Sequence, residues 1–249
     1  MGFLINGAAG HRNSLQGIDI RQGFVFVKSY CRDLPSQQYA GFFINQMEFL
    51  MAIQSAQIKI TGINYLLQNN PQTVDPFNRF SKAMKTITKK RTGKTEDDLI
   101  ELGNIETESK IYFDEKLGVY IPTRWMTEAI CTGAFSVIKV GKDKMRGGIF
   151  AVDEKAKLIY KDMNKVKTIT DVVMNPVFRH RALLPQGQVR IPKDFPIFKD
   201  WSFETAIEFD DTVVDFAGLK AVVERTAKYV GFGDFRPTFG RATAEVTNV

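Results

Sequence analysis

The last roughly fifty residues constrain the fold of this chain more than any other stretch. Trp201–Phe209 alternates polar and apolar residues, as a strand with one buried face does. Asp215 can cap an amphipathic helix that ends near Tyr229, and Gly231 can stop it. Residues 239–246 then have the pattern of a final strand. A strand, a helix and a strand in this order predict a sheet with a helix packed on one face.

Glycines, phenylalanines and arginines are concentrated between that helix and the final strand, in Tyr229–Arg241. This segment holds three glycines, three phenylalanines and two arginines. Glycine allows a backbone to approach another molecule closely. The segment ends a helix instead of opening one, so it is a poor dinucleotide-binding fingerprint. Its candidate contact residues are Phe235, Arg236 and Arg241, although Arg236 could also pair with Asp234.

The rest of the chain supplies elements for the same sheet. Gln57–Ile63 alternates like a strand, and Pro122 opens a helix that runs to about Val137. Together with the C-terminal elements, this pattern predicts an α+β protein with a ferredoxin-like or RRM-like βαββαβ core. The six pieces are Gln57–Ile63, the helix from Pro122, the strands near Val172–Phe178 and Trp201–Phe209, the helix from Asp215 and the strand near Thr243. Further helices and β-hairpins are expected as insertions.

Two inserted helices have their own start signals. Asp75 and Pro76 suit the cap and the first position of one helix. Thr95 begins a capping box for the next helix, in which we expect Leu99, Ile100, Leu102 and Ile105 on the inner side. The lysines around the end of the first helix either complement its dipole or form a phosphate-binding patch.

The first fifty residues read differently from the rest. We therefore expect an N-terminal extension or arm, residues 1–50, and a domain of residues 51–249. The first part is either upstream sequence foreign to the domain or an arm that packs on a neighbouring subunit. Its apolar side chains would be unfavourable to leave in water, which supports an arm. The side chains concerned are Phe42, Phe43, Phe49 and Leu50.

Composition limits the chemistry that the chain can perform. Only two of its 249 residues are cysteine and two are histidine. Cys31, Cys131, His11 and His180 lack ligand spacing, which excludes the usual Cys/His zinc site, and we expect no metal and no cofactor. Two lone cysteines suggest a reducing compartment, the cytoplasm of a bacterium or of a phage-infected host. No apolar run reaches the roughly 18 residues of a membrane span, so no membrane partner is expected.

Positive charge is the main clue to a partner. The formal net charge is +6 and the isoelectric point is about 9.2, which fits a polyanionic partner and equally an ordinary solvated surface. A mobile basic loop with three glycines, 139–148, and a predicted hairpin, 177–191, carry several of these charges. The predicted nucleic-acid-binding residues are Lys139, Lys142, Lys144, Arg146, Arg179, His180, Arg181, Arg190, Phe235, Arg236 and Arg241.

A ferredoxin-like core with a basic loop, a basic hairpin and the late glycine-rich segment Ala227–Arg241 resembles the RAMP superfamily. These are the RNA-binding backbone and processing proteins of CRISPR effectors. The same segment, together with Gly62 and the pair Leu66 and Leu67, is also similar to uncharacterised tailed-phage proteins. The resemblance covers Met51–Val249. It implies single-stranded nucleic-acid binding and a homo-oligomer that assembles side by side along the strand.

Three functions are compatible with these features. The preferred one is a binding protein for single-stranded RNA or DNA, gripped by basic side chains and aromatic platforms. The second is a metal-independent RNA endonuclease, for which His180 is the candidate general acid or base in the domain. The third is a phage structural or assembly protein that binds no nucleic acid. Each residue also has a plain structural interpretation: Phe239 can belong to the core, and His180 can be an ordinary surface residue.

Overall fold

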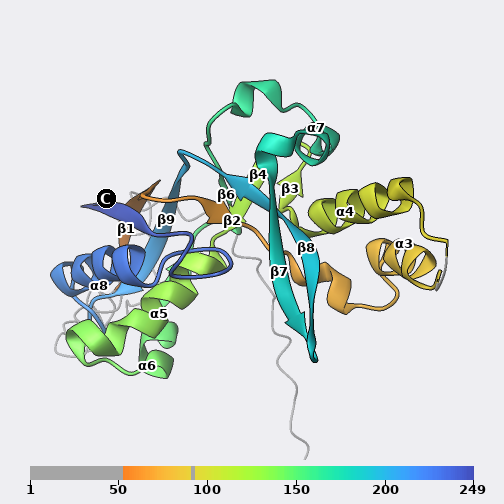
Figure 1. Cartoon of the computed structure of the whole chain (residues 1–249). Helices are drawn as coiled ribbons and strands as arrows, with labels where there is room; N and C mark the ends of the chain where they lie inside the picture. Colours follow the sequence, from red (N-terminus) through yellow and green to blue (C-terminus); the bar gives the residue numbers. More distant parts are fainter. Residues whose placement is uncertain (1–52, 91–92) are drawn as a thin grey trace, which may run out of the picture. The chain divides into compact units, whose positions relative to one another are not determined.

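A four-stranded antiparallel sheet organises the part of the chain that the structure describes (Figure 1). The computed structural model describes residues 53–90 and 93–249, and the expected arm, residues 1–50, lies outside them. The sheet order is β10 (Ala242–Asn248), β1 (Ile53–Gly62), β9 (Ser202–Asp210) and β5 (Ile149–Ala151). β1 pairs antiparallel with β10 and β9, and β9 pairs antiparallel with β5. β1 and β9 are therefore the central strands.

Two helices, α5 (Arg124–Ile138) and α8 (Phe216–Tyr229), complete the core. α5 precedes β5 and α8 precedes β10, so the core elements follow each other as strand, helix, strand, strand, helix, strand. In the sheet, the four strands lie in the order fourth, first, third, second. This is the ferredoxin-like βαββαβ topology, and the predicted α+β fold is confirmed.

Alternation along the strands decides which sheet face the helices cover. Ile58 and Ile60 in β1 are fully buried, whereas Lys59 between them is exposed. Leu219 of α8 is also fully buried. Burying a side chain of this size contributes about 1.5–3 kcal/mol. The predicted cap of α8, Asp215, accepts a hydrogen bond from a first-turn N–H at 2.8 Å.

The second core strand differs from the prediction. Val172–Phe178, expected as a strand, forms instead α7 (Ile169–Met174) and the 3-10 helix Pro176–Phe178. A capping box between Thr168 and Asp171 starts α7 and diverts this stretch from the sheet. The strand that takes its place is β5, whose three residues are too few for a clear alternating pattern.

Two insertions build the rest of the unit. The one between β1 and α5 contains β2 (Leu66–Leu67), the 3-10 helix Pro71–Val74, α3 (Arg79–Thr88), α4 (Glu96–Lys110), β3 (Phe113–Asp114) and β4 (Gly118–Pro122). The one between β5 and β9 contains β6 (Lys155–Lys157), the 3-10 helix Met163–Lys165, α7, β7 (Arg179–Gln186) and β8 (Val189–Phe198). β2, β8 and β7 form one small sheet, and β3, β4 and β6 form another. A short helix, α6 (Lys142–Gly147), links α5 to β5.

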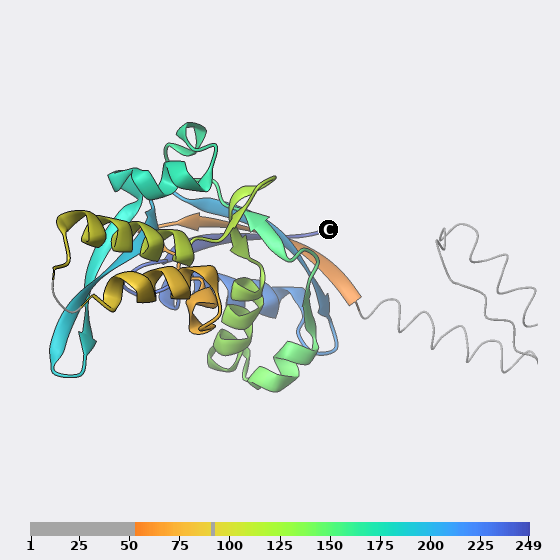
Figure 2. The same ribbon diagram turned by 90° about the vertical axis from the view of Figure 1, so that its right-hand side faces the viewer.

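The predicted hairpin 177–191 is confirmed as β7 and β8. The two strands pair antiparallel from Arg179, opposite Pro196, to Gln186, opposite Val189. Gly187 forms the turn with a φ of +61°, which lies in the left-handed region that favours glycine. Figure 2 shows the tip of this hairpin and the start of β1 at opposite sides of the unit.

One of the two predicted helix starts is confirmed and the other is wrong. The Thr95 capping box of α4 is present, and Asp98 completes it. α3 begins after Asn78, whose side chain accepts a hydrogen bond from a first-turn N–H at 2.9 Å, and not after Asp75. Asp75 instead accepts a hydrogen bond from the backbone N–H of Phe77 in a local turn.

The inner side of α4 is more polar than the sequence predicts. Of the four apolar side chains expected there, Leu102 and Ile105 are half-buried, whereas Leu99 and Ile100 are 53% and 50% exposed. The buried residues of this helix are Asp98, Gly103, Glu106, Thr107 and Ser109. Glu106 accepts a hydrogen bond from Asp194 of β8, so a polar contact joins this helix to the hairpin.

Candidate nucleic-acid interface

The glycine-rich loop joins the core to the β2–β8–β7 sheet. After α8 it doubles back on itself, and Phe232 N donates a hydrogen bond to Gly240 O at 2.8 Å. Asp234 N donates to Leu67 O at 3.0 Å, and Gly240 N donates to Tyr65 O at 2.8 Å. Backbone hydrogen bonds therefore hold the loop against the segment that contains β2.

Close backbone approach explains two glycines of the loop. Gly233 and Gly240 have φ values of +76° and +77°. A Cβ atom on Gly233 would lie 2.3 Å from Leu67 O, and one on Gly240 would lie 1.7 Å from Phe232 O. Neither position has space for a side chain, so these glycines shape the loop.

Gly240→Ala is expected to lower the urea midpoint of unfolding. Left-handed backbone strain alone costs about 1–3 kcal/mol, and the clash with Phe232 O adds to it. Gly147→Ala in α6 is the matched control, because its added Cβ meets nothing within 4 Å. We expect the control to gain about 0.5–1 kcal/mol from the higher helix propensity of alanine. Equal midpoints for the two variants would contradict the close approach at Gly240.

Phe235 and Phe239 of the loop pack on the hairpin. The ring centroids of Phe235 and Phe195 lie 5.1 Å apart at an interplanar angle of 87°. The ring of Phe239 lies 5.3 Å from that of His180. These contacts form a small apolar cluster with Leu67. Phe235 therefore fastens the loop to the hairpin and is only partly accessible to a partner.

Two tyrosine rings are exposed at the borders of this loop, and the sequence analysis did not single them out. Tyr229 is 58% exposed and Tyr65 is 45% exposed. Arg225 and Lys228 lie 5.2 and 5.6 Å from the ring centroid of Tyr229. Lys199 lies 5.2 Å from that of Tyr65. The available signal was helical spacing, since Arg225 and Tyr229 are four residues apart and share one face of α8.

An open depression of about 540 Å³ lies at the end of α8. Its lining residues are Tyr229, Val230, Gly233, Asp234, Phe235, Arg236 and Pro237. Arg236 is exposed, and no ion pair joins it to Asp234 within the described part of the chain. Asp234 instead accepts a hydrogen bond from Asn69 Nδ2 at 2.7 Å. The guanidinium of Arg236 is therefore free to meet a ligand at the rim.

Arg241 has a structural role at the other end of the loop. Its Nε donates to Lys228 O at 2.9 Å, and its backbone N–H donates to Asn64 Oδ1 at 2.8 Å. Asn64 Nδ2 in turn donates to Thr238 O at 2.7 Å. These hydrogen bonds close the loop against the end of α8.

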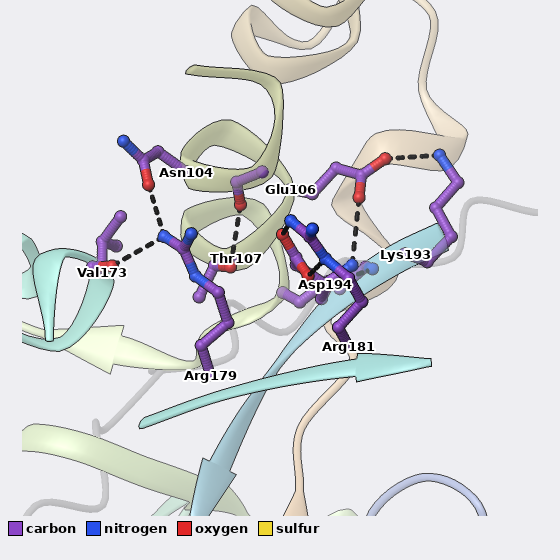
Figure 3. A network of polar contacts seen from close by, with 10 residues as sticks. Asn104, Glu106, Thr107, Val173, Arg179, Arg181, Lys193 and Asp194 are labelled. Atoms are coloured by element: carbon purple, nitrogen blue, oxygen red, sulfur yellow. Dashed lines mark hydrogen bonds and ion pairs between the residues drawn. The ribbon is translucent and has the colours of Figure 1, made fainter. Parts of the chain in front are cut away.

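The hairpin arginines differ in what holds them (Figure 3). Arg181 Nε and Nη2 donate to the two carboxylate oxygens of Asp194 at 2.8 and 2.9 Å. Asp194 is 2% exposed, whereas the Arg181 side chain is 60% exposed. Arg179 donates to Val173 O at 2.9 Å and to the side-chain oxygen of Asn104. Arg181 therefore joins the two strands of the hairpin, whereas Arg179 ties the hairpin to α4 and α7.

The hairpin carries two further predicted residues, Arg190 and His180, which differ in exposure. Arg190 is exposed beside the turn, opposite Pro185. His180 is half-buried, and no hydrogen bond joins its side chain to another residue in the described ranges. Within those ranges, no three His, Cys, Asp or Glu side chains are grouped so that they could hold a metal ion.

Two side chains of α4 form hydrogen bonds with the backbone of β8, as a neighbouring strand would. Glu106 accepts a hydrogen bond from Asp194 N at 3.1 Å, and Lys110 Nζ donates to Asp194 O at 2.5 Å. Without these contacts, the edge of β8 would leave both backbone groups unpaired. Lys110 Nζ also lies 3.5 Å from the ring centroid of Phe195, and burial lowers the pKa of Lys110 to about 8.

The segment 139–148 is not the mobile loop that the sequence suggested. It contains α6, which is anchored by the fully buried Met145. Lys142 and Arg146 lie 3.3 and 3.1 Å from the carboxylate of Glu128. These two cations are therefore paired within the protein.

α6 and the glycine-rich loop lie at opposite ends and opposite edges of the main sheet. It leads into the start of β5, whereas the loop leads into the start of β10. β5 and β10 are opposite edges and run in opposite directions, so their starts lie at opposite ends. Lys139, Lys142, Lys144 and Arg146 thus do not share a surface with the loop and the hairpin.

The sheet face that α5 and α8 leave open is acidic. Its exposed side chains include Glu204, Glu208 and Glu245, and Lys59 lies 3.6 Å from Glu204. Among the four core strands, Phe150 is the one exposed aromatic residue. Carboxylates repel phosphates, so the charge of this face does not support an RRM-type binding platform on the sheet.

Comparison with known proteins gives structural similarity only. No protein-family model matches the chain, and no curated protein matches it. A chain of the Type III-B Cmr-beta structure bound to cognate target RNA is similar with a TM-score of 0.39 and 11% identity, over 92% of this chain and 75% of that one. Cmr6 from Pyrococcus furiosus is similar with a TM-score of 0.30 and 12% identity, over 78% of this chain and 99% of that one. In the part of the chain that the structure describes, no helix is long and apolar enough to cross a membrane.

Proposed function

We propose that this protein binds single-stranded nucleic acid, RNA or DNA, along the glycine-rich loop and the adjoining hairpin. The observation that carries this proposal is the pair of exposed rings, Tyr65 and Tyr229, which border the same loop with cations beside each. We propose further that copies assemble side by side along the bound strand.

The chemistry of the loop surface suits a flexible strand. Unpaired bases stack on exposed aromatic rings, and each stacked base contributes about 1–3 kcal/mol. Phosphates need cations that are not already neutralised. Lys199, Arg225 and Arg236 form no ion pair with a carboxylate among the residues that the structure covers, unlike the cations of α6.

The proposed interface includes only part of the predicted residue set. Within the described residues, Arg236 and Arg190 are the exposed cations of that set on the loop and hairpin that no carboxylate pairs with, and Arg241 and Phe235 hold the loop in shape. His180 supports Phe239 from the hairpin side. Residues 139–146 would meet only a strand that passes around the domain.

Salt dependence of binding tests the proposal. We expect the full-length chain to bind short fluorescent oligo(U) and oligo(dT) at low salt, with an affinity that falls steeply as salt is added, because phosphate contacts release counterions. Arg236→Ala should weaken binding to both probes and reduce the salt slope by about one. Fluorescence anisotropy measures both quantities.

Lys144→Ala is the matched control, since this exposed cation lies on α6 at the other end of the sheet. It should leave affinity and slope unchanged. Absence of binding at low salt would overturn the proposal and favour an assembly protein that binds no nucleic acid. An equal loss in both arginine and lysine variants would show binding through diffuse charge, and would contradict the placement of the site.

A further inference from the structure

Three lysines on α3 form a charged surface that the proposed interface does not include. Lys82, Lys85 and Lys89 are exposed, and none of them pairs with a carboxylate in the ranges that the structure describes. Steps of three and four residues place all three on one side of the helix. Phe80 and Ile87 are buried and hold the opposite side against the protein. We call the three side chains the α3 lysine stripe.

The helix itself does not account for the whole stripe. Cations near the end of a helix complement its dipole, which explains Lys85 and Lys89 but not Lys82, in the first half of α3. Like charges three or four residues apart destabilise a helix by about 0.2–0.5 kcal/mol per pair. No acidic residue lies within α3 to offset this repulsion. The stripe therefore favours an anionic partner from outside the helix.

The cations at the two ends of the helix differ from the stripe because they are paired. Arg79 Nη2 lies 3.0 Å from Glu108 Oε1, and Lys90 Nζ lies 2.6 Å from Asp98 Oδ1. Both carboxylates belong to α4, so these two pairs join α3 to α4. The charges of the stripe do not take part in this attachment and are available to a ligand.

An exposed aromatic ring lies beside the stripe. Phe77, just before α3, is 78% exposed, and Lys82 Nζ lies 6.0 Å from its ring centroid. Tyr65 and Tyr229 show a similar arrangement, each an exposed ring with a cation 5.2 Å from its centroid. A base can stack on such a ring while the neighbouring cation meets a phosphate. The ring therefore favours a single strand with accessible bases over a polyanion without bases.

The stripe lies within reach of a strand that occupies the glycine-rich loop. Asp234 of the loop accepts a hydrogen bond from Asn69 Nδ2 at 2.7 Å. Phe77 follows Asn69 by eight residues, so it lies at most about 29 Å away even if the chain between them is fully extended. The 3-10 helix Pro71–Val74 within this stretch shortens that distance. Figure 1 shows α8 and α3 on opposite sides of the β7–β8 hairpin, so the two surfaces are separate.

We propose that Phe77 and the α3 lysine stripe form a second contact for the bound strand, beyond the glycine-rich loop. The inference rests on the proposed function and extends its binding site. Lys82, Lys85 and Lys89 meet phosphates, and Phe77 stacks with a base. An oligonucleotide that fills only the loop does not reach this contact, whereas a longer one occupies both.

Probe length separates the two contacts in a fluorescence anisotropy experiment on the full-length chain. The probes are oligo(U) of about 4 and about 16 nucleotides, the two ends of the site sizes of single-strand-binding OB folds. Lys82→Ala with Lys85→Ala should weaken binding of the longer probe and reduce its salt slope by about 1.4, since each phosphate contact on a single strand contributes about 0.7. The shorter probe should bind this variant and the unaltered protein equally, whereas Arg236→Ala should weaken both probes.

Phe77→Ala tests the ring in the same experiment. It should weaken binding of the longer probe by about 5- to 150-fold, the equivalent of one stacked base, and leave the salt slope unchanged. Phe77→Tyr should keep most of the affinity. If Phe77→Ala binds the longer probe like the unaltered protein, the inference is overturned, because charge alone would serve any polyanion.

Lys144→Ala with Lys220→Ala is the matched control, since it removes two exposed charges from α6 and from the first half of α8. It should leave the binding of both probes unchanged. Absence of binding by both probes at low salt would overturn the proposed function and this inference with it. Unchanged binding of the longer probe by the Lys82 and Lys85 variant would overturn the inference alone. An equal loss for both probes, or an equal loss in the control, would do the same.

Discussion

Replacing Tyr229 by alanine is expected to weaken oligo(U) binding by about 5- to 150-fold, the equivalent of one lost stacked base at 1–3 kcal/mol. Tyr65→Ala should cost a similar factor, and the double variant more than either. Tyr229→Phe should keep most of the affinity, because stacking needs the ring and not the hydroxyl group. Fluorescence anisotropy at one fixed salt concentration measures the series.

The slope of log affinity against log salt concentration distinguishes base stacking from phosphate contacts in the same experiment. Tyr229 is uncharged, so its removal should lower the affinity and leave the slope unchanged, whereas Arg236→Ala changes the slope. The ring of Tyr229 is 58% exposed, so its loss should change the free energy of unfolding by no more than about 0.5 kcal/mol. Unchanged affinity in both alanine variants, or an equal loss in Tyr229→Phe, would contradict the role of the rings as platforms.

Replacing Asp194 by alanine is expected to destabilise the protein by about 1.5–3 kcal/mol. The carboxylate is 2% exposed and accepts two hydrogen bonds from Arg181. The Arg181 side chain that remains is 60% exposed and can be hydrated, so the cost stays below the roughly 3–5 kcal/mol of breaking a fully buried ion pair. Urea unfolding, followed by circular dichroism, measures the change.

Lys161→Ala is the control for the Asp194 variant, because it breaks an exposed ion pair and leaves Asp200 in place, whose φ of +47° disfavours alanine. The Asp200 side chain is 75% exposed and lies 3.8 Å from Lys161. Exposed ion pairs contribute about 0–1 kcal/mol, so this variant should unfold close to the unaltered protein. If both variants lose the same stability, the ion pair between Asp194 and Arg181 does not stabilise the hairpin beyond an exposed pair. A loss at Asp194 alone would confirm that this pair stabilises the hairpin.

Much of the core could be predicted because its signals are local. The alternation around Lys59 and the cap at Asp215 each depend on neighbouring residues, and both are confirmed. The hairpin turn at Gly187 is of the same kind. β5 could not be located as the second core strand, because three residues carry too little pattern to compete with Val172–Phe178.

The candidate site was only partly predictable. The sequence indicates the glycine-rich loop and favours Phe235 within it, but the structure packs Phe235 on the hairpin. Tyr65, near the end of β1, enters the site through a backbone hydrogen bond with Gly240, about 175 residues later in the chain, and such a long-range contact leaves no local signal. Tyr229 could have been found, because its spacing from Arg225 places both on one face of a helix.

The sequence by itself determined five of the six elements of the ferredoxin-like core, because strand alternation and helix capping are read from residues close together in the chain. Only the tertiary structure decided which residues of α4 are buried and where the positive charge is available. Glu106 and Asp194 are 88 residues apart in sequence, and their contact buries a carboxylate on α4 that the local pattern does not indicate. The same applies to charge. The sequence alone does not distinguish Lys142 and Arg181 from Arg236. Folding pairs the first two with carboxylates and leaves Arg236 exposed in the glycine-rich loop.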